Sequence, residues 1–516
     1  MYQNRRSTYN GFILLFVALK VILNLFALSH FGFQRDELLH LALGDHLAWG
    51  YKEIPPFIAV LGRIITIVFG SSVFATRIFS TIAAGLIIWF TGLITVELGG
   101  RKFAITLACL ALICSPAFLA SDYLFQPVVF DQLWWVLTAY LAIKYVNTSS
   151  VKYLYFIGLV VGIGLLTKYS MGFFALALVI GLLFTKQRRV FSNKHFWFAI
   201  LVAFVIFLPT LLWEYIHHFP FITHMNELRQ NQLQFVKSTD FIFQQLLVNG
   251  VTVIIWLTGF FFLLFAFKLR KYQFLAFTYA LVFLFLLQMN GKAYYLFGAY
   301  PMLFAAGAYG FERWIKNVAL RTITVLVFTI PVLLILPLVL PIFPLNTTLA
   351  RFDHVNGKYP FLHFISTWED QKLHRTSQDY GDMFGWDEMT RKVDSVYKTL
   401  TPDEQKHTII FADNYGEAGA IHHYGRQYGL PDVVSLGSSF ALWSPPSIAN
   451  ADYIIYVDDS QNVEKRVGQL AAGYKKTGQV DNTLAVEHGT SIYLISHPTL
   501  KLNQVYQKVR AEKLSE

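Results

Sequence analysis

The feature that most constrains this chain is a series of apolar runs, each long enough to cross a lipid bilayer as a helix. A span needs about 20 apolar residues, because the hydrocarbon core is about 30 Å thick and a helix rises about 1.5 Å per residue. Eleven such runs occur in the first 345 residues, centred near residues 20, 86, 111, 136, 161, 178, 204, 257, 281, 303 and 331. We therefore expect an α-helical multi-spanning membrane protein with about 11 transmembrane helices.

One further apolar segment, residues 57–69, is too short to cross. It contains 13 residues with Arg63 near its middle, and as a helix it covers only about 20 Å. An amphipathic stretch precedes it. We expect this segment to lie in the plane of the membrane interface.

The formal net charge of +10 is unevenly distributed along the chain. Residues 1–345 hold 25 Lys and Arg against 11 Asp and Glu, whereas the remaining residues hold 17 against 21. The basic excess lies in loops between apolar runs, where it orients a chain in the membrane. We therefore expect membrane lipids and no nucleic acid among the partners.

The loops also predict the orientation. If the N-terminus is cytoplasmic, the inner loops collect 16 Lys and Arg and the outer loops collect eight. Such a bias is the positive-inside pattern, so we expect a multi-pass protein of the cell (inner) membrane with its N-terminus in the cytoplasm. Nine of the 11 acidic residues in the membrane half then fall on the outer side, which indicates a polar site there.

The character of the chain changes after Pro344. Residues 346–516 are polar, and strand-like runs such as HTIIFAD and DYIIYVDD alternate with helical stretches at residues 417–429 and 463–474. This alternation is typical of an α/β domain. We therefore divide the chain into a transmembrane domain, residues 1–345, and a soluble C-terminal α/β domain, residues 346–516. Eleven spans place the second domain on the outer, periplasmic or extracellular, side.

Six different motifs follow one another along the chain, each near the outer end of an apolar run. The first outer loop, residues 31–74, carries FQRDELLH and a Pro-Pro pair. The others are ATRIFS (75–80), VVFDQLWW (128–135), GLLTKYS (164–170), LLWEYIHHFP (211–220) and GKAYYLFGAYP (291–301). This set resembles the polyprenyl-phosphate-sugar-dependent glycosyltransferases of GT-C type. More narrowly, it resembles the bacterial branch related to protein O-mannosyltransferases and the lipid A aminoarabinose transferase. The resemblance covers residues 11–345.

The resemblance implies an inverting membrane glycosyltransferase. Such an enzyme moves a hexosyl or pentosyl group from a polyprenyl-phosphate-linked donor to a glycolipid, polysaccharide or protein acceptor on the outer face. The acceptor hydroxyl must lose a proton as it attacks, and a carboxylate within about 3 Å of it serves as the general base. Asp36 matches the family's first-loop acid, Glu37 is expected to support it, and Asp131 matches the second acid. The alternative is that Asp36 is a solvated loop acid and that Asp131 is an acid favoured by the dipole at the start of a helix.

Three cations on the outer side oppose the orientation rule. We expect Arg77, Lys168 and Lys292 to bind the donor phosphate, because cations stabilise charge that builds on a leaving group. Snorkelling toward the interface is the alternative explanation. Glu214, His217, Tyr294 and Tyr295 are expected to contact substrate.

The sequence leaves the acceptor, the cofactor and one alternative function undecided. The aminoarabinose transferase has a Lys before its Pro-Pro pair, where this chain has Ile54, so its lipid A specificity does not transfer directly. No cofactor is certain, and a divalent metal ion at the acidic pair stays open. The alternative function is a secondary transporter or flippase of a lipid-linked or anionic substrate, although transporters carry internal repeats that this sequence lacks.

Overall fold

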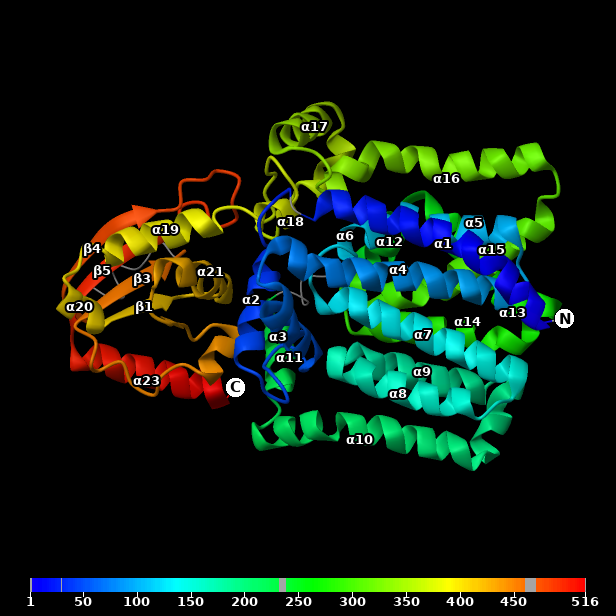
Figure 1. Ribbon diagram of the computed structural model, residues 1–516, viewed down its shortest axis with the longest axis horizontal. Helices are drawn as coiled ribbons and strands as arrows, with labels where there is room; N and C mark the ends of the chain where they lie inside the picture. The colour runs from blue at the N-terminus through cyan, green and yellow to red at the C-terminus, as the bar shows by residue number, and fades with distance from the viewer. Residues whose placement is uncertain (1, 29, 232–237, 460–469, 516) are drawn as a thin grey trace.

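The computed structural model describes residues 2–28, 30–231, 238–459 and 470–515. It contains a helical bundle and a smaller α/β domain that lies against one end of the bundle (Figure 1). The mostly helical fold with a small C-terminal sheet domain is therefore confirmed.

The bundle has a helix over each predicted apolar centre. These are α1 (Tyr2–Ala27), α4 (Val73–Glu97), α5 (Lys102–Cys114), α7 (Pro127–Thr148), α8 (Lys152–Thr167), α9 (Ser170–Leu183), α10 (Lys194–Ile216), α13 (Val253–Phe265), α14 (Gln273–Gln288), α15 (Tyr300–Trp314) and α16 (Val318–Val339). In the described chain, five helical segments are long and apolar enough to cross a membrane, or up to seven if each of two bent helix pairs forms one span. The chain is thus a multi-pass membrane protein, and the number of eleven spans stays a prediction.

Glycines let two bundle helices approach closely. A Cβ on Gly259 of α13 would lie 1.9 Å from the carbonyl oxygen of Leu303 in α15, and one on Gly307 would lie 1.9 Å from that of Ile255. Small residues at a crossing allow backbone contact between membrane helices, where packing replaces the hydrophobic effect as the driving force. The two glycines therefore set the distance between α13 and α15.

Short helices cover the end of the bundle that faces the α/β domain. Two of them, α2 (Arg35–Asp45) and α3 (Phe57–Phe69), run across the bundle ends and stand between the two domains (Figure 1). The short apolar segment at residues 57–69 is thus a helix of 13 residues, and its place in the membrane interface stays a prediction. The other short helices of the bundle half are α6 (Pro116–Ser121), α11 (Pro220–Asn231) and α12 (Ser238–Leu247), with 3₁₀ turns at Lys186–Ser192, Gly250–Thr252, Phe267–Tyr272 and Ala293–Ala299.

The α/β domain has a five-stranded sheet in the order β2-β1-β3-β5-β4. The first three strands are parallel, and β5 pairs antiparallel with β3 and β4. Their bounds are β1 (Thr408–Ala412), β2 (Val433–Val434), β3 (Tyr453–Asp458), β4 (Ala471–Gln479) and β5 (Ser491–Pro498). The helices are α17 (Leu345–Lys358), α18 (Gln378–Gly381), α19 (Trp386–Tyr397), α20 (Pro402–Lys406), α21 (Tyr415–Tyr424) and α23 (Leu500–Ser515), with 3₁₀ turns at Pro360–Ile365, Gly425–Tyr428 and Ser438–Leu442.

One predicted helix of this domain is wrong in part. Of residues 463–474, the first seven lie outside the described residues, and Ala471–Tyr474 belong to strand β4. Pairing with β5 over most of its length stabilises the strand. Edge pairing has thus overridden the local helical pattern.

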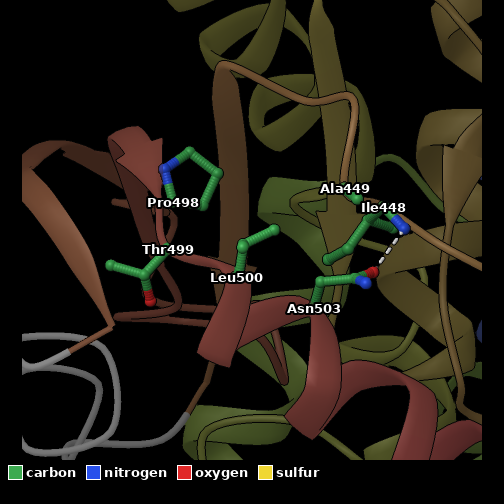
Figure 2. Close-up of a pocket in the computed structure, with 6 residues that line it drawn as sticks. All are labelled: Ile448, Ala449, Pro498, Thr499, Leu500 and Asn503. Atoms are coloured by element: carbon green, nitrogen blue, oxygen red, sulfur yellow. Dashed lines mark hydrogen bonds between the residues drawn. The ribbon is translucent and has the colours of Figure 1, made fainter.

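The C-terminal helix is anchored at its start. Figure 2 shows Asn503 of α23 accepting a hydrogen bond from the backbone N–H of Ile448, at 2.8 Å, beside Thr499 and Leu500. The small hollow between these residues is lined by the loop before β3, by the end of β5 and by the start of α23. The hydrogen bond of Asn503 attaches the last helix to the loop before β3.

The helix α2 belongs to the cores of both halves of the molecule. Leu38, Leu39 and Ala42 join one apolar cluster with Trp386 and Ile421 of the α/β domain, and the same helix packs against α3. The first outer loop therefore holds the two domains together.

Candidate active site

A capping box at the start of α2 sends the two adjacent acids in different directions. The side-chain oxygen of Gln34 accepts the N–H of Asp36 at 2.8 Å, and the carboxylate of Glu37 accepts the N–H of Gln34 at 2.8 Å. Both hydrogen bonds satisfy N–H groups that a helix end leaves unpaired. Glu37 is thereby turned back into the protein, whereas Asp36 stays half-buried at the edge of a cavity.

Glu37 forms a fully buried ion pair with Arg77. The guanidinium Nη2 lies 2.8 Å from Oε2 and Nε lies 2.9 Å from Oε1, and both side chains are 0% exposed. The backbone N–H of Phe125 also donates to Oε1 at 2.8 Å. Neither residue lines the cavity. This arrangement favours the supporting role predicted for Glu37 and gives Arg77 a partner other than a donor phosphate.

Between the bundle and the α/β domain lies a cavity of about 790 Å³. Its walls bring together half of the residues predicted from the sequence: Asp36, Lys168, Lys292, Tyr294 and Tyr295. Apolar side chains from the bundle, such as Phe173 and Phe285, line another part of the wall. The cavity therefore combines an acidic group, two cations and an apolar surface.

The two lysines form a cationic wall. The Nζ of Lys168 lies 4.7 Å from the ring centroid of Tyr294 and 4.8 Å from that of Tyr295, so the aromatic faces hold the ammonium group. Lys292 is near enough for the two positive charges to repel each other. An anion between them would relieve that repulsion.

Asp131, Glu214 and His217 lie outside the cavity lining. Asp131 accepts hydrogen bonds from Trp135 at 3.0 Å and Ser170 at 2.7 Å, and both of these donors line the cavity. Glu214 accepts the hydroxyl of Tyr169, another lining residue, at 2.6 Å. Asp131 and Glu214 thus do not line the cavity themselves, but they accept hydrogen bonds from side chains that do.

His217 is exposed and its ring stacks on Trp213, with centroids 4.1 Å apart. A different histidine of the same segment, His224, lines the cavity. The motif LRQNQLQF, residues 228–235, is expected from the sequence to close over a lipid substrate, and residues 232–235 of it lie outside the described residues.

The α/β domain contributes side chains that sequence reasoning missed. The hydroxyl of Tyr415, at the start of α21, donates to Oδ1 of Asp36 at 2.9 Å, and Gln126 donates to Oδ2 at 3.3 Å. Asp382 lies 3.6 Å from the Nε of Arg35. Burial raises the pKa of Asp382 to about 7; Arg35 opposes this shift and Asp36 adds to it. No local motif marks these residues, because they meet the first loop only in the folded chain.

The acidic pair is poorly arranged to hold a metal ion. Both oxygens of Glu37 already accept hydrogen bonds from Arg77, Phe125 and Gln34. Across the described residues, no group of three or more potential ligands with metal-binding spacing includes Asp36 or Glu37. The metal ion left open at this pair therefore stays an untested prediction.

We expect Glu37→Gln to destabilise the protein far more than Asp36→Asn. Removing one charge of a buried pair leaves the other uncompensated, which costs about 3–5 kcal/mol. Asp36 is half-buried and faces a cavity, so its neutral variant should unfold near the wild-type temperature. Thermal unfolding of the purified proteins in detergent measures both. Equal midpoints for the two variants would contradict the structural role of the Glu37–Arg77 pair.

A second prediction concerns Glu53, which follows α2 and accepts hydrogen bonds from Ser438 and Ser439 of the α/β domain. Burial raises the pKa of Glu53 to about 7, against the opposing effects of the Ser439 hydrogen bond and Lys52. Because the folded-state pKa lies above the unfolded one, the stabilisation is complete below about pH 4.5 and is lost as pH rises to about 7.

The unfolding temperature should therefore fall between pH 5 and pH 8, and Glu53→Gln should reduce that fall. The glutamine variant keeps the size of the side chain and cannot titrate. Thermal unfolding at both pH values provides the comparison. An unchanged pH dependence in Glu53→Gln would show that this carboxyl does not titrate in the interface.

Comparisons with known proteins agree with the resemblance predicted from the motifs. Residues 53–213 match the family model of the dolichyl-phosphate-mannose-protein mannosyltransferases. A comparison with curated protein sequences finds no match.

Two solved structures are similar over nearly the whole chain. One is ArnT from Cupriavidus metallidurans bound to undecaprenyl phosphate, with a TM-score of 0.64, 12% identity and coverage of 94% of this chain and 98% of that chain. The other is the same protein in the apo state, with a TM-score of 0.63, 13% identity and the coverage of 94% and 98%. The chain thus has the fold of GT-C glycosyltransferases and is similar to the protein O-mannosyltransferases and to ArnT.

Proposed function

We propose that this protein is an inverting membrane glycosyltransferase that transfers a sugar from a polyprenyl-phosphate-linked donor to an acceptor hydroxyl. The observation that carries the proposal is the cavity whose lining includes Asp36 together with Lys168 and Lys292. A base for the acceptor and cations for the leaving phosphate are the two groups that such a transfer needs. Asp36 would act on the attacking hydroxyl of the acceptor, and the two lysines would act on the leaving phosphate.

The proposed reaction has one bond-forming and one bond-breaking event. The acceptor oxygen attacks the anomeric carbon while its proton passes to a carboxylate oxygen of Asp36. The bond from the anomeric carbon to the phosphate oxygen breaks, and the electron pair leaves with the polyprenyl phosphate. Lys168 and Lys292 stabilise the charge that this oxygen gains, and the phosphate needs little acid assistance because it is already a stable anion.

Neighbouring side chains would keep Asp36 in place for this step. Tyr415 holds one carboxylate oxygen and Gln126 holds the other. Asp131 and Glu214 would position the opposite wall through Ser170 and Tyr169. We assign these groups positioning roles, because none of the four acts on the reacting atoms.

The comparisons support a lipid-linked donor. ArnT, whose structure is similar over 94% of this chain, has been crystallised with undecaprenyl phosphate. The apolar part of the cavity wall, which includes Phe173 and Phe285, suits the first isoprenyl units of such a donor. The basic excess in the predicted inner loops supports an outer-face reaction, since the orientation predicted from it would put the end of the bundle that bears α2 on the outer side.

We expect Asp36→Asn to lower turnover about 10²–10⁴-fold, the usual contribution of general base catalysis. The amide keeps the size and can still accept a hydrogen bond from Tyr415, but it cannot take the acceptor's proton. Tyr415→Phe removes a single hydrogen bond and should lower turnover less. Transfer of radiolabelled sugar by purified protein in detergent measures the rate.

Donor binding by Asp36→Asn serves as the control, and its affinity should stay near the wild-type value. An Asp36→Asn protein that binds donor and transfers sugar at the normal rate would refute the catalytic assignment. Movement of the lipid-linked substrate from one leaflet of a vesicle membrane to the other, without any sugar transfer, would instead favour a flippase.

We expect Lys168→Ala and Lys292→Ala to weaken donor binding, because each removes a positive charge from the proposed phosphate site. Lys168→Arg should restore binding only in part, since a planar guanidinium differs in shape from the compact ammonium that lies beside the two tyrosine rings. Equilibrium binding of polyprenyl phosphate, with exposed Lys186→Ala as the matched control, tests this. Wild-type affinity for polyprenyl phosphate in both alanine variants would contradict the proposed role of Lys168 and Lys292 in phosphate binding.

A further inference from the structure

A histidine of α2 lines the cavity one helical turn after Asp36. Asp36 and His40 stand four residues apart, a spacing that puts both side chains on one face of a helix, and both line the cavity. His40 is only 5% exposed. Because buried polar side chains are normally hydrogen-bonded, the partners of its two ring nitrogens decide what this side chain can bind.

The first ring nitrogen, Nδ1, is held by the backbone of Phe125. It lies 3.0 Å from the carbonyl oxygen of that residue. A carbonyl oxygen only accepts hydrogen bonds, so the proton of the neutral ring must be on Nδ1. The N–H of Phe125 donates to Glu37 at 2.8 Å. One buried residue of the loop before α7 therefore fixes both the tautomer of His40 and the direction of Glu37.

The second ring nitrogen, Nε2, has no hydrogen-bond partner in the described part of the chain. Nor is it among the described polar atoms that are fully enclosed without a partner, so a molecule in the cavity can reach it. Burial lowers the pKa of His40, although Asp36, the Phe125 carbonyl and Glu37 oppose this shift. The ring is therefore neutral at about pH 7, and its Nε2 accepts hydrogen bonds.

The proposed reaction brings a sugar ring beside this histidine. Asp36 takes the proton of the acceptor oxygen, and that oxygen attacks the anomeric carbon of the donor. The transferred sugar must therefore lie next to Asp36, on the face of α2 that also carries His40. Its hydroxyl groups can donate hydrogen bonds. The donor always carries this sugar, whereas a protein acceptor need carry none.

We propose that His40 binds the transferred sugar, with its Nε2 accepting a hydrogen bond from a hydroxyl group of the donor. This inference rests on the proposed transfer function and adds a contact for the sugar itself to the base and the cations. A site built to pair with a hydroxyl discriminates against an analogue that lacks it, because the buried group is then left unpaired. His40 is thus a residue that determines which sugar the cavity accepts.

Binding of defined lipids to the full-length protein in detergent tests the proposal. The probes are undecaprenyl phosphate and the same lipid linked to mannose, glucose, galactose or arabinose. We expect at least one sugar-bearing lipid to bind the wild type more tightly than undecaprenyl phosphate does. His40→Asn should weaken the binding of that lipid about 3–10-fold, the usual contribution of one neutral hydrogen bond. Its affinity for undecaprenyl phosphate should stay at the wild-type value.

Matched variants separate the hydrogen bond from other effects of the substitution. The shorter side chain of His40→Asn can still donate to the Phe125 carbonyl but has no acceptor at the position of Nε2. In His40→Gln the amide oxygen reaches about as far as Nε2, so this variant should recover part of the lost affinity. His407→Asn changes an exposed histidine of the α/β domain and should bind every probe as the wild type does.

The results distinguish a failure of this inference from a failure of the proposed function. If the wild type does not bind undecaprenyl phosphate, the phosphate site fails and the role of His40 fails with it. If it binds this lipid but binds no sugar-bearing lipid more tightly, or if His40→Asn binds all of them normally, only the role of His40 is overturned. An equal loss of affinity for undecaprenyl phosphate and the sugar-bearing lipids would also overturn it, because that result indicates a structural role.

A measurement on the wild type keeps the test decisive if His40→Asn does not fold. Diethyl pyrocarbonate acylates an unprotonated imidazole nitrogen, and mass spectrometry of the peptide that contains His40 gives the rate. The sugar-bearing lipid should slow this acylation relative to undecaprenyl phosphate, which has no sugar to cover Nε2. Equal rates of acylation with the two lipids would overturn the proposal.

Discussion

The buried ion pair between Glu37 and Arg77 is the interaction on which the candidate site depends. It joins the start of α2 to α4, and the N–H of Phe125 adds the loop before α7. Burying two charges away from water is costly unless the charged groups are paired and hydrogen-bonded. Here each carboxylate oxygen of Glu37 accepts hydrogen bonds from at least two donors. Because Glu37 is held inward, Asp36 must face the cavity.

The cavity separates its charges by their structural origin. The cations come from the bundle, where Lys168 ends α8 and Lys292 precedes the turn to α15. Most of the acids come from the first outer loop and from the α/β domain, including Asp36, Asp379 and Asp382. The cavity of about 790 Å³ that these groups line has room for a polar ligand.

The α/β domain is therefore part of the site rather than an appendage. It shares an apolar core with α2, supplies Tyr415 to Asp36 and places Asp382 beside Arg35. These contacts connect the packing of the soluble domain to the geometry of the first loop.

The sequence by itself determined the membrane class, the helix over each apolar centre and the resemblance to GT-C glycosyltransferases, because hydrophobic run length and local motifs do not depend on distant contacts. It also marked Asp36, Lys168 and Lys292. Only the tertiary structure decided that Glu37 and Arg77 face each other, since Gln34 is a weak capping signal and side-chain direction depends on it. Tyr415 meets Asp36 across 379 residues, a contact that exists only once both domains have packed on α2.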